Sequence, residues 1–336
     1  MKPEKILILK NDRGGDLFIS LKTISSLLKN NDVTIYLSSL NIGFKFLFKK
    51  VKILEKKVKQ NFIDKIKLII DIYKNNYNSI YILTPKNFYF FLPVFFWKTK
   101  FYAIVIDNNK KSRPNVFLRN LLTNYKVINR DKLNKKRSSL LQLELLNKSI
   151  NVDENYSNLT IPEIDNSIKS LLPKNFIFFQ FKKTFFNKLN WSINEFNDLT
   201  NFFLKKYDNV LFSSDIEYND FNKYFVNNYS YIDTKNNKIL LKNNNKIYYL
   251  KDVNSQDLFT ILNYSSYIVC PHGLITHISR FLNKDSLNLF NFSINSNKDI
   301  THEKISFSEW YLNMNLNFIF LNKDINKSIS KISKFI

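Results

Sequence analysis

The sequence predicts an α/β protein made of two Rossmann-like domains. Apolar runs of strand length alternate with segments of helical periodicity, and the alternation stops and restarts around residues 150–172. Strands that alternate with helices usually form a parallel sheet with helices on its faces. A chain of 336 residues is also long for a single hydrophobic core, which favours two domains.

The first half begins with the apolar run Lys5–Lys10, which ends at a glycine loop and is typical of a buried parallel strand. Leu17, Leu21, Ile24 and Leu28 then recur at helical spacing, which predicts a helix directly after this loop. The same reasoning predicts strands at 33–39, 51–54, 79–84 and 101–106, and helices at 43–50, 62–73 and 136–149.

The second half repeats the pattern after a polar, turn-rich stretch that ends at Pro173, where we place the linker. Ser192 and Glu195 are the ends of a capping box, which predicts a helix that continues to about Lys206. Further strands are predicted at 176–181, 209–213, 246–250, 267–270 and 286–290, and helices at 256–264 and 276–282. We expect an N-terminal domain at 1–160, a second domain at 161–322, and an amphipathic C-terminal helix at 323–336.

The rarest residue types of the chain gather in two loops. Residues 270–277 hold the only cysteine, two of the three histidines and one of the four glycines. Gly14 and Gly15 stand in the loop 11–16, after the first strand. An average protein of this length carries roughly two dozen glycines. Because glycine is so scarce here, we expect the remaining ones where no side chain fits, and we take the two loops as the functional candidates.

Asp16 follows the first strand and its glycines, so it is expected at the carboxyl end of a parallel sheet. Ligands bind at that edge in open α/β sheets. A carboxylate near a helix N-terminus is stabilised as the anion, and it could accept a proton from a substrate hydroxyl. The alternative interpretation is that Asp16 only caps its helix.

The second loop has the same order of strand, glycine and helix. Unpaired backbone N–H groups between Gly273 and Thr276 would form an anion site suited to a diphosphate, and His277 would add a donor. Lys188, after another strand, could supply a positive charge to the same phosphates. Open alternatives are a helix cap with a hydrogen-bonded histidine, and a lysine that is only solvated.

Zinc is a rival for this loop, because Cys270, His272, His277 and His302 are suitable ligand types. Their spacing lacks a second thiolate and matches no familiar zinc site, so we expect no metal. A cysteine at the end of an apolar strand is usually a buried, inert thiol, which argues against nucleophilic catalysis by Cys270.

Composition limits the partners and the location. The net charge is +23, but the lysines are dispersed and no nucleic-acid-binding signature is present, so we expect no nucleic-acid partner. A weak preference for anionic lipid or polyanionic glycans is the more useful inference. One cysteine fits a reducing compartment, and no stretch reaches the ~18 apolar residues of a membrane span, so we expect a cytoplasmic protein. The aromatic segment 88–97 is either a buried helix or a patch that contacts the inner face of the inner membrane.

Two segments resemble a known family. Residues 7–17, an apolar strand followed by Arg13-Gly14-Gly15-Asp16 and a helix, look like the N-terminal signature of glycosyltransferase family 9, the heptosyltransferases of lipopolysaccharide core synthesis. Residues 250–290 follow the family's order of capped helix, apolar strand and Gly…His loop, and Lys188-Leu189-Asn190-Trp191 is similar to its Lys-x-Trp segment. The resemblance implies a GT-B fold, α/β with two Rossmann-like domains facing a central cleft. The N-terminal domain would bind the acceptor and the C-terminal domain the nucleotide-sugar.

The resemblance also implies roles for individual residues. Asp16 would be the general base, with Arg13, Gly14 and Gly15 supporting its loop or the acceptor. The residues implied to bind the donor are Lys188, Gly273, Leu274, Thr276 and His277. In the family, an acidic residue stands two positions before the loop glycine and the histidine three positions after it. This chain has Pro271 and His277, which is four positions after Gly273.

The expected activity is therefore inverting, metal-independent transfer of a sugar, with heptose as one candidate, to a glycan or lipopolysaccharide-core-type, lipid-linked acceptor. A nucleoside-diphosphate sugar would be the co-substrate, and no cofactor is expected. Two alternatives remain at this point: a non-catalytic basic protein that binds nucleotides or polyanions on the same scaffold, and a GT-B enzyme outside this family.

Overall fold

The structure of the chain is a computed structural model. It describes residues 3–107, 114–129, 138–146, 152, 155–161, 166–214, 230–233, 239–243, 246–251, 253–291 and 317–336. The chain divides into two compact units, the first containing Met1–Ile161 and the second Pro162–Ile300 and Asn313–Ile336. Each unit is built on a mainly parallel sheet with helices, so the predicted fold class, α/β with two Rossmann-like domains, is confirmed.

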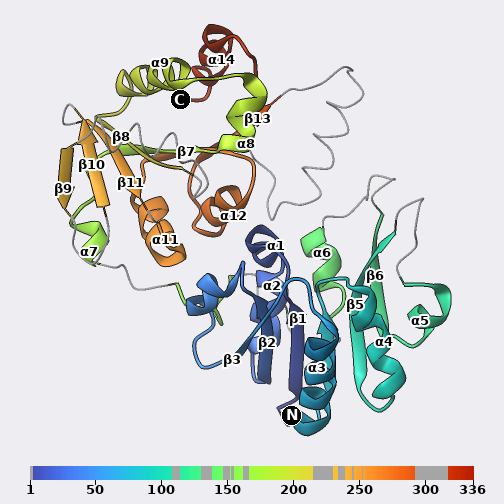
Figure 1. Ribbon diagram of the computed structural model, residues 1–336. Helices are drawn as coiled ribbons and strands as arrows, with labels where there is room; N and C mark the ends of the chain where they lie inside the picture. The colour runs from blue at the N-terminus through green and yellow to red at the C-terminus, as the bar shows by residue number, and fades with distance from the viewer. Residues whose placement is uncertain are drawn as a thin grey trace. The chain divides into compact units, whose positions relative to one another are not determined.

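The first unit contains a six-stranded parallel sheet in the order β3-β2-β1-β4-β5-β6 (Figure 1). Ile6, Leu7, Ile8 and Leu9 of β1 are completely buried, as expected for an apolar central strand. The strands are β1 (Lys5–Lys10), β2 (Asp32–Ser38), β3 (Lys52–Lys56), β4 (Ser79–Ile82), β5 (Lys100–Asp107) and β6 (Asn124–Asn129). The helices are α1 (Gly14–Ile19), α2 (Leu21–Leu28), η1 (Ile42–Leu47), α3 (Phe62–Asn75), α4 (Asn87–Phe95), α5 (Val116–Asn120) and α6 (Ser138–Leu143).

The second unit contains an eight-stranded sheet in the order β14-β13-β12-β7-β8-β11-β10-β9, in which β10 is antiparallel to both its neighbours. Its core is rich in phenylalanine, and Phe179, Phe181, Phe186 and Phe196 pack ring against ring. The strands are β7 (Phe176–Phe181), β8 (Asn209–Ser214), β9 (Ser230–Asp233), β10 (Ile239–Asn243), β11 (Ile247–Lys251), β12 (Tyr267–Pro271), β13 (Ser286–Asn291) and β14 (Asn317–Leu321). The helices are α7 (Asn166–Lys169), α8 (Lys183–Phe186), η2 (Asn187–Leu189), α9 (Ile193–Leu204), α11 (Ser255–Tyr264), α12 (Leu274–Phe281) and α14 (Ile325–Ile332).

Both sheets reverse their strand order once. In the first unit the chain runs from β1 outward to β2 and β3, then continues with β4 on the other side of β1. In the second unit the same reversal separates β7 from β12. At such a switch point the loops after the two strands part and leave a crevice, where ligands of open α/β sheets bind. The carboxyl ends of β1 and β4, and of β7 and β12, are therefore the places to look for sites.

Most expected elements are confirmed, and the differences have local causes. The single helix expected from Leu17 to Leu28 is in fact two helices, α1 and α2. The helix is interrupted at Ser20, whose hydroxyl donates to the Asp16 carbonyl at 3.4 Å and whose N–H donates to the Leu17 carbonyl. The helix expected at 43–50 is the 3₁₀ helix η1. The sequence did not predict β6, β9 or β14, which are three of the four edge strands, nor β10, α5 and α7.

The aromatic segment 88–97 forms α4 and the turn after it. Tyr89 and Phe90 are completely buried, whereas Phe91 and Phe95 are 48% and 57% exposed. The buried-helix interpretation is therefore right for one face of α4 only. Among the helices that the structure describes, none is long and apolar enough to cross a membrane.

Candidate functional site

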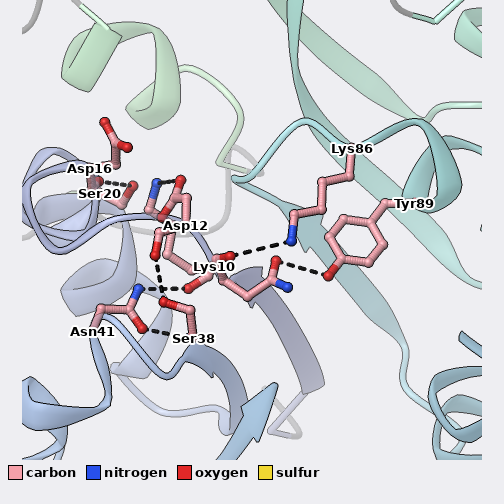
Figure 2. A network of polar contacts seen from close by, with 9 residues as sticks. Lys10, Asp12, Asp16, Ser20, Ser38, Asn41, Lys86 and Tyr89 are labelled. Carbon is pink, nitrogen blue, oxygen red and sulfur yellow. Dashed lines mark hydrogen bonds and ion pairs between the residues drawn. The ribbon is translucent and has the colours of Figure 1, made fainter. Parts of the chain in front are cut away.

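The loop after β1 is fixed by buried polar contacts (Figure 2). Lys10 is the last residue of the strand, and its ammonium lies 2.7 Å from the Asp12 carboxylate. The Asn41 amide donates to the Lys10 carbonyl at 3.1 Å, and the Ser38 hydroxyl donates to the Asp12 carbonyl. Lys10, Ser38 and Asn41 are all buried. These bonds anchor the loop to the end of β2 and to the turn that follows it.

A second set of contacts ties the same loop to the start of α4. The Tyr89 hydroxyl donates to Oδ1 of Asn11 at 2.8 Å, and the Lys86 ammonium donates to the Asn11 carbonyl at 3.3 Å and to the Val58 carbonyl at 2.5 Å. Burial lowers the pKa of Lys86 to about 8, a shift that the Asp12 carboxylate opposes. The loop backbone that precedes Asp16 is therefore hydrogen-bonded to the end of β2 and the turn after it, and also to the start of α4.

Asp12 is the paired carboxylate of this loop, and its side chain is 19% exposed. Burial raises the pKa of Asp12, the Lys10 ammonium opposes the rise, and the neighbouring Asp16 carboxylate adds to it. Because Lys10 pairs with it directly, Asp12 is suited to fix the loop rather than to exchange protons with a substrate. Sequence reasoning did not single out Lys10 or Asp12, although both flank the turn between the strand and the glycines.

Asp16 is the second carboxylate, partly exposed in the first turn of α1. Figure 2 shows its carboxylate outside the bonded network. The N-cap of α1 is Arg13, an exposed residue whose side chain makes no cap hydrogen bond, so Asp16 does not cap the helix. Gly14 and Gly15 are the first two helical residues and have no positive φ, so their backbone does not require glycine.

Asp16 lines a pocket of about 220 Å³ at the carboxyl ends of β1 and β4, the switch point of the first sheet. One wall is apolar and is formed by Ile19, Leu83, Pro85, Ile104, Ile106 and Ile128. The polar lining residues are Lys10, Asp12, Asp16, Thr84, Ser138 and Gln142. Sequence reasoning did not find Ser138 and Gln142, because only the packing of α6 against the sheet edge brings them to Asp16.

The loop after β12 is organised by its own residues. Gly273 is the N-cap of α12 and has a φ of 158°, a backbone conformation that other residues rarely adopt. Its N–H donates to the Thr276 hydroxyl at 3.3 Å, and that hydroxyl donates to Oδ1 of Asn288 at 2.5 Å. Thr276 is completely buried. The hydrogen bonds of the Thr276 side chain therefore hold the loop in place. Leu274 is the first residue of α12, so the first N–H groups of this helix directly follow Gly273.

Both histidines of this loop are neutral near pH 7, His277 being buried and His272 partly buried. Burial lowers the pKa of His277 to about 4. Burial, with smaller contributions from His277 and Lys182, lowers the pKa of His272 to about 3. The His272 ring stacks on Phe290, with ring centroids 5.5 Å apart. Any phosphate bound here would meet neutral imidazole and backbone N–H groups rather than imidazolium.

Two lysines are candidates for a positive charge near this loop. Lys188 lies in η2 and is exposed. Lys182 directly follows β7, which pairs with β12, and its charge acts on His272. Lys182 is therefore at the switch point of the second sheet. The contact of Lys188 with the donor diphosphate stays a prediction. The signal that could have found Lys182 is its place immediately after a buried strand.

Cys270 is completely buried, and burial raises the pKa of its thiol to about 12, so it has the properties of an inert thiol. His302 lies outside the described residues. Within the described part of the chain, no group of three His, Cys, Asp or Glu side chains could hold a metal ion.

Comparisons with known proteins find a likeness in structure alone. No protein-family model matches this chain, and no curated protein matches its sequence. ADP-heptose LPS heptosyltransferase II of E. coli superposes with a TM-score of 0.64 at 12% identity, over 98% of each chain. A glycosyl transferase of family 9 from Veillonella parvula matches with a TM-score of 0.62 at 12% identity, over 100% of this chain and 91% of that one. UDP-GlcNAc 2-epimerase from Methanocaldococcus jannaschii gives 0.56 at 12% identity, over 98% and 92%.

These matches extend over nearly the whole chain and include both units. They show that the chain has the GT-B fold, and they confirm the resemblance to glycosyltransferase family 9 at the level of structure. At 12% identity the likeness concerns the fold, so the activity has to be argued from the site.

Proposed function

We propose that this protein is a glycosyltransferase that moves a sugar from a nucleoside-diphosphate donor to a glycan or lipid-linked acceptor. One observation carries the proposal. On a fold shared with heptosyltransferases, the switch point of the first sheet presents a pocket with the partly exposed carboxylate of Asp16. A carboxylate that has no partner among the described residues and lies beside a pocket is suited to act as a general base.

In the proposed reaction, Asp16 accepts the proton of an acceptor hydroxyl while the hydroxyl oxygen bonds to the anomeric carbon of the donor. The bond from that carbon to the phosphate oxygen breaks, and the nucleoside diphosphate leaves with the electron pair. Attack opposite the leaving group inverts the anomeric configuration. Lys10, Asp12 and Asn11 take no part in proton transfer and hold the backbone that carries Asp16.

The second unit would bind the donor. The N–H groups after Gly273 are suited to the diphosphate, and the charge that develops on it would be stabilised by these groups and by Lys182 or Lys188. The heptosyltransferase neighbour is named for ADP-heptose, so ADP-heptose is the first donor to test and UDP-sugars are the second. His277 would contribute as a neutral hydrogen-bond donor.

The variant Asp16→Asn tests the base. It keeps the size of the side chain and should bind ADP or UDP as the wild type does, yet transfer should fall by about 10²–10⁴-fold, the usual range for loss of an acid or base. Asp32→Asn is the matched control, because Asp32 is an exposed carboxylate at the amino end of β2, the opposite edge of the same sheet. Transfer by Asp16→Asn at the rate of this control would rule out Asp16 as the base.

Two other activities fit parts of the same observations. The epimerase match favours a reaction of the donor without an acceptor, and the net charge of +23 favours a binding protein without catalysis. Release of nucleoside diphosphate separates them. A transferase releases it in proportion to added acceptor, an epimerase converts the sugar with no acceptor present, and a binding protein does neither.

A further inference from the structure

Four residues that line the pocket beside Asp16 have a buried side-chain atom without a hydrogen-bond partner within the described residues: Asp12 (Oδ1), Thr84, Ser138 and Gln142. Two of these residues, Ser138 and Gln142, lie on α6. Ser138 and Gln142 are each 3% exposed, and the Ser138 hydroxyl and the Gln142 amide oxygen make no hydrogen bond within the described residues. They are four residues apart on α6, so they lie on one face of that helix, and both line the pocket. Buried polar atoms in folded proteins nearly always have a partner, and an occupant of the pocket with hydroxyl groups would supply it.

The size and the apolar wall of the pocket limit this occupant. A volume of about 220 Å³ is below the ~300–1,000 Å³ of pockets that hold drug-sized ligands, so it suits one ring rather than a chain of rings. One face of the occupant would contact the apolar side chains of Ile19, Leu83, Pro85, Ile104, Ile106 and Ile128. A pyranose ring has this dual character, because its C–H groups form an apolar face while its hydroxyls surround the edge.

The charges that line the pocket limit the occupant further. Among the described lining residues, Lys10 is the cation, and it is 2% exposed and paired with Asp12 at 2.7 Å. Asp16 leaves one carboxylate in excess. The Lys86 ammonium is close to Asp12 but donates to two backbone carbonyls and does not line the pocket. With respect to these described lining residues, a phosphate or carboxylate on the occupant would therefore meet a negative charge and no unpaired cation.

We infer that this pocket binds one uncharged, hydroxyl-bearing sugar ring of the acceptor, with its hydroxyls bonded to Ser138 and Gln142, and that it rejects a phosphorylated or carboxylated ring. The inference rests on the proposed function, since it names the class of acceptor that presents its hydroxyl to Asp16. Ser138 and Gln142 are specificity-determining residues in this assignment.

Saturation-transfer NMR on the full chain tests the inference without any turnover. The probes are methyl α-mannopyranoside and methyl α-glucopyranoside, with mannose 6-phosphate and methyl glucuronide as the charged counterparts. The neutral glycosides should bind and the charged ones should bind at least tenfold more weakly. Ser138→Ala and Gln142→Ala should each weaken the neutral glycosides by roughly threefold to tenfold, the effect of one hydrogen bond.

Thermal unfolding distinguishes a binding role from a structural one. Without ligand, Ser138→Ala should not lower the melting temperature, because the hydroxyl has no hydrogen bond to lose among the described residues. A clear fall in Tm with unchanged glycoside binding would mean that Ser138 is structural, and the inference would be wrong. Charged sugars that bind as tightly as neutral ones, or neutral glycosides that fail to bind, would also overturn it.

Binding of ADP and UDP, measured by calorimetry on the same samples, reports separately on the proposed function. If nucleotides bind while neutral glycosides do not, the inference about the pocket fails and the proposed function stands. If glycosides bind as expected while no nucleotide does, the pocket assignment holds and the proposed transfer fails.

Discussion

The loop after β1 and the loop after β12 each lie at the switch point of their own sheet, on opposite sides of the reversal in strand order, and they differ in chemistry. The first is rich in charge: Lys10, Asp12 and Asp16 lie together beside an open pocket. The second is uncharged, with two neutral histidines and a glycine whose backbone conformation other residues rarely adopt.

Under the proposed function, this difference would let one sheet architecture serve two tasks. A carboxylate that accepts a proton needs contact with solvent or substrate and no fixed partner. Asp16 is partly exposed and has no ion pair within the part of the chain that the structure describes. A loop that binds a diphosphate needs N–H groups in a fixed arrangement, which the Gly273–Thr276–Asn288 hydrogen bonds provide. Changes in the first loop should thus affect chemistry, and changes in the second should affect stability and nucleotide binding.

The largest effect on stability should come from acid. The pKa of His272 is about 3 and that of His277 about 4, both below the ~6.5 of an unfolded histidine. The unfolded chain therefore takes up protons first as the pH falls. The stability that the neutral histidines contribute is complete above pH ~6.5 and is lost below it, by about 2 kcal/mol for each imidazole between pH 6.5 and 5.

Urea unfolding at several pH values measures this loss. The raised pKa of Asp12 acts in the opposite direction, because its folded form holds a proton more readily. His277→Gln removes one imidazole and should flatten the slope of the free energy of unfolding against pH by about one proton. A slope identical to that of the wild type would mean that His277 titrates normally in the folded protein.

The next effect concerns the glycines of the two loops, which should respond with opposite sign. Gly273→Ala places a Cβ where no atom lies within 4 Å, so the cost is conformational, about 1–3 kcal/mol of unfolding free energy. Gly15→Ala changes a helical residue and should leave stability unchanged or raise it by up to ~1 kcal/mol. Chemical denaturation measures the unfolding free energy of both variants. An equal change in this free energy for the two variants would show that the two loops do not differ in their need for glycine.

The next prediction concerns Lys182 and Lys188, the two candidates for a positive charge near the loop after β12. If Lys182 lies at the donor site, Lys182→Ala should weaken ADP or UDP binding roughly tenfold, as expected for one charge-assisted hydrogen bond, and reduce its salt dependence. Lys188→Ala is the matched control and should bind nearly as the wild type, because Lys188 is exposed in η2. If calorimetry showed weaker nucleotide binding by the Lys188 variant instead, it would support Lys188 as the donor-binding lysine, as the family resemblance implies.

The sequence predicted what local pattern controls. The apolar run of β1, the capping box of Ser192 and Glu195, and the glycine–histidine loop are each readable from neighbouring residues, and all three are present. The edge strand β6, with the sequence NYKVIN, was missed because an edge strand needs fewer apolar residues than a central one.

The candidate site was predicted only in part, for a different reason. Asp16 could be found because its place after a central strand determines its edge of the sheet. Ser138 and Gln142 reach that edge from more than 100 residues away, through the packing of α6, and nothing in the sequence near them indicates the pocket. The choice between Lys182 and Lys188 likewise depends on which strand pairs with β12.

The smallest predicted effect concerns lipid. The surface of α4 presents Phe91, Val94 and Phe95, and Trp97 beyond its end is 79% exposed. The structure adds an apolar stripe on α3, where Phe62, Ile63, Ile66, Ile70 and Tyr73 are exposed. The Lys65 ammonium lies 5.5 Å from the Phe88 ring centroid, which places the two helices next to each other, and exposed lysines 67, 74 and 98 accompany them.

We expect this α3–α4 surface to bind anionic vesicles reversibly, since each basic residue near an anionic membrane contributes about 1 kcal/mol and apolar side chains add to it. Sedimentation with phosphatidylserine vesicles should recover the protein with the lipid at low salt and release it at high salt. The double variant Phe62→Ser/Trp97→Ser should bind less, whereas Phe335→Ser, a partly exposed residue of the second unit, should bind as the wild type. Equal recovery with anionic and neutral lipid would contradict the prediction, because it would leave no role for the lysines.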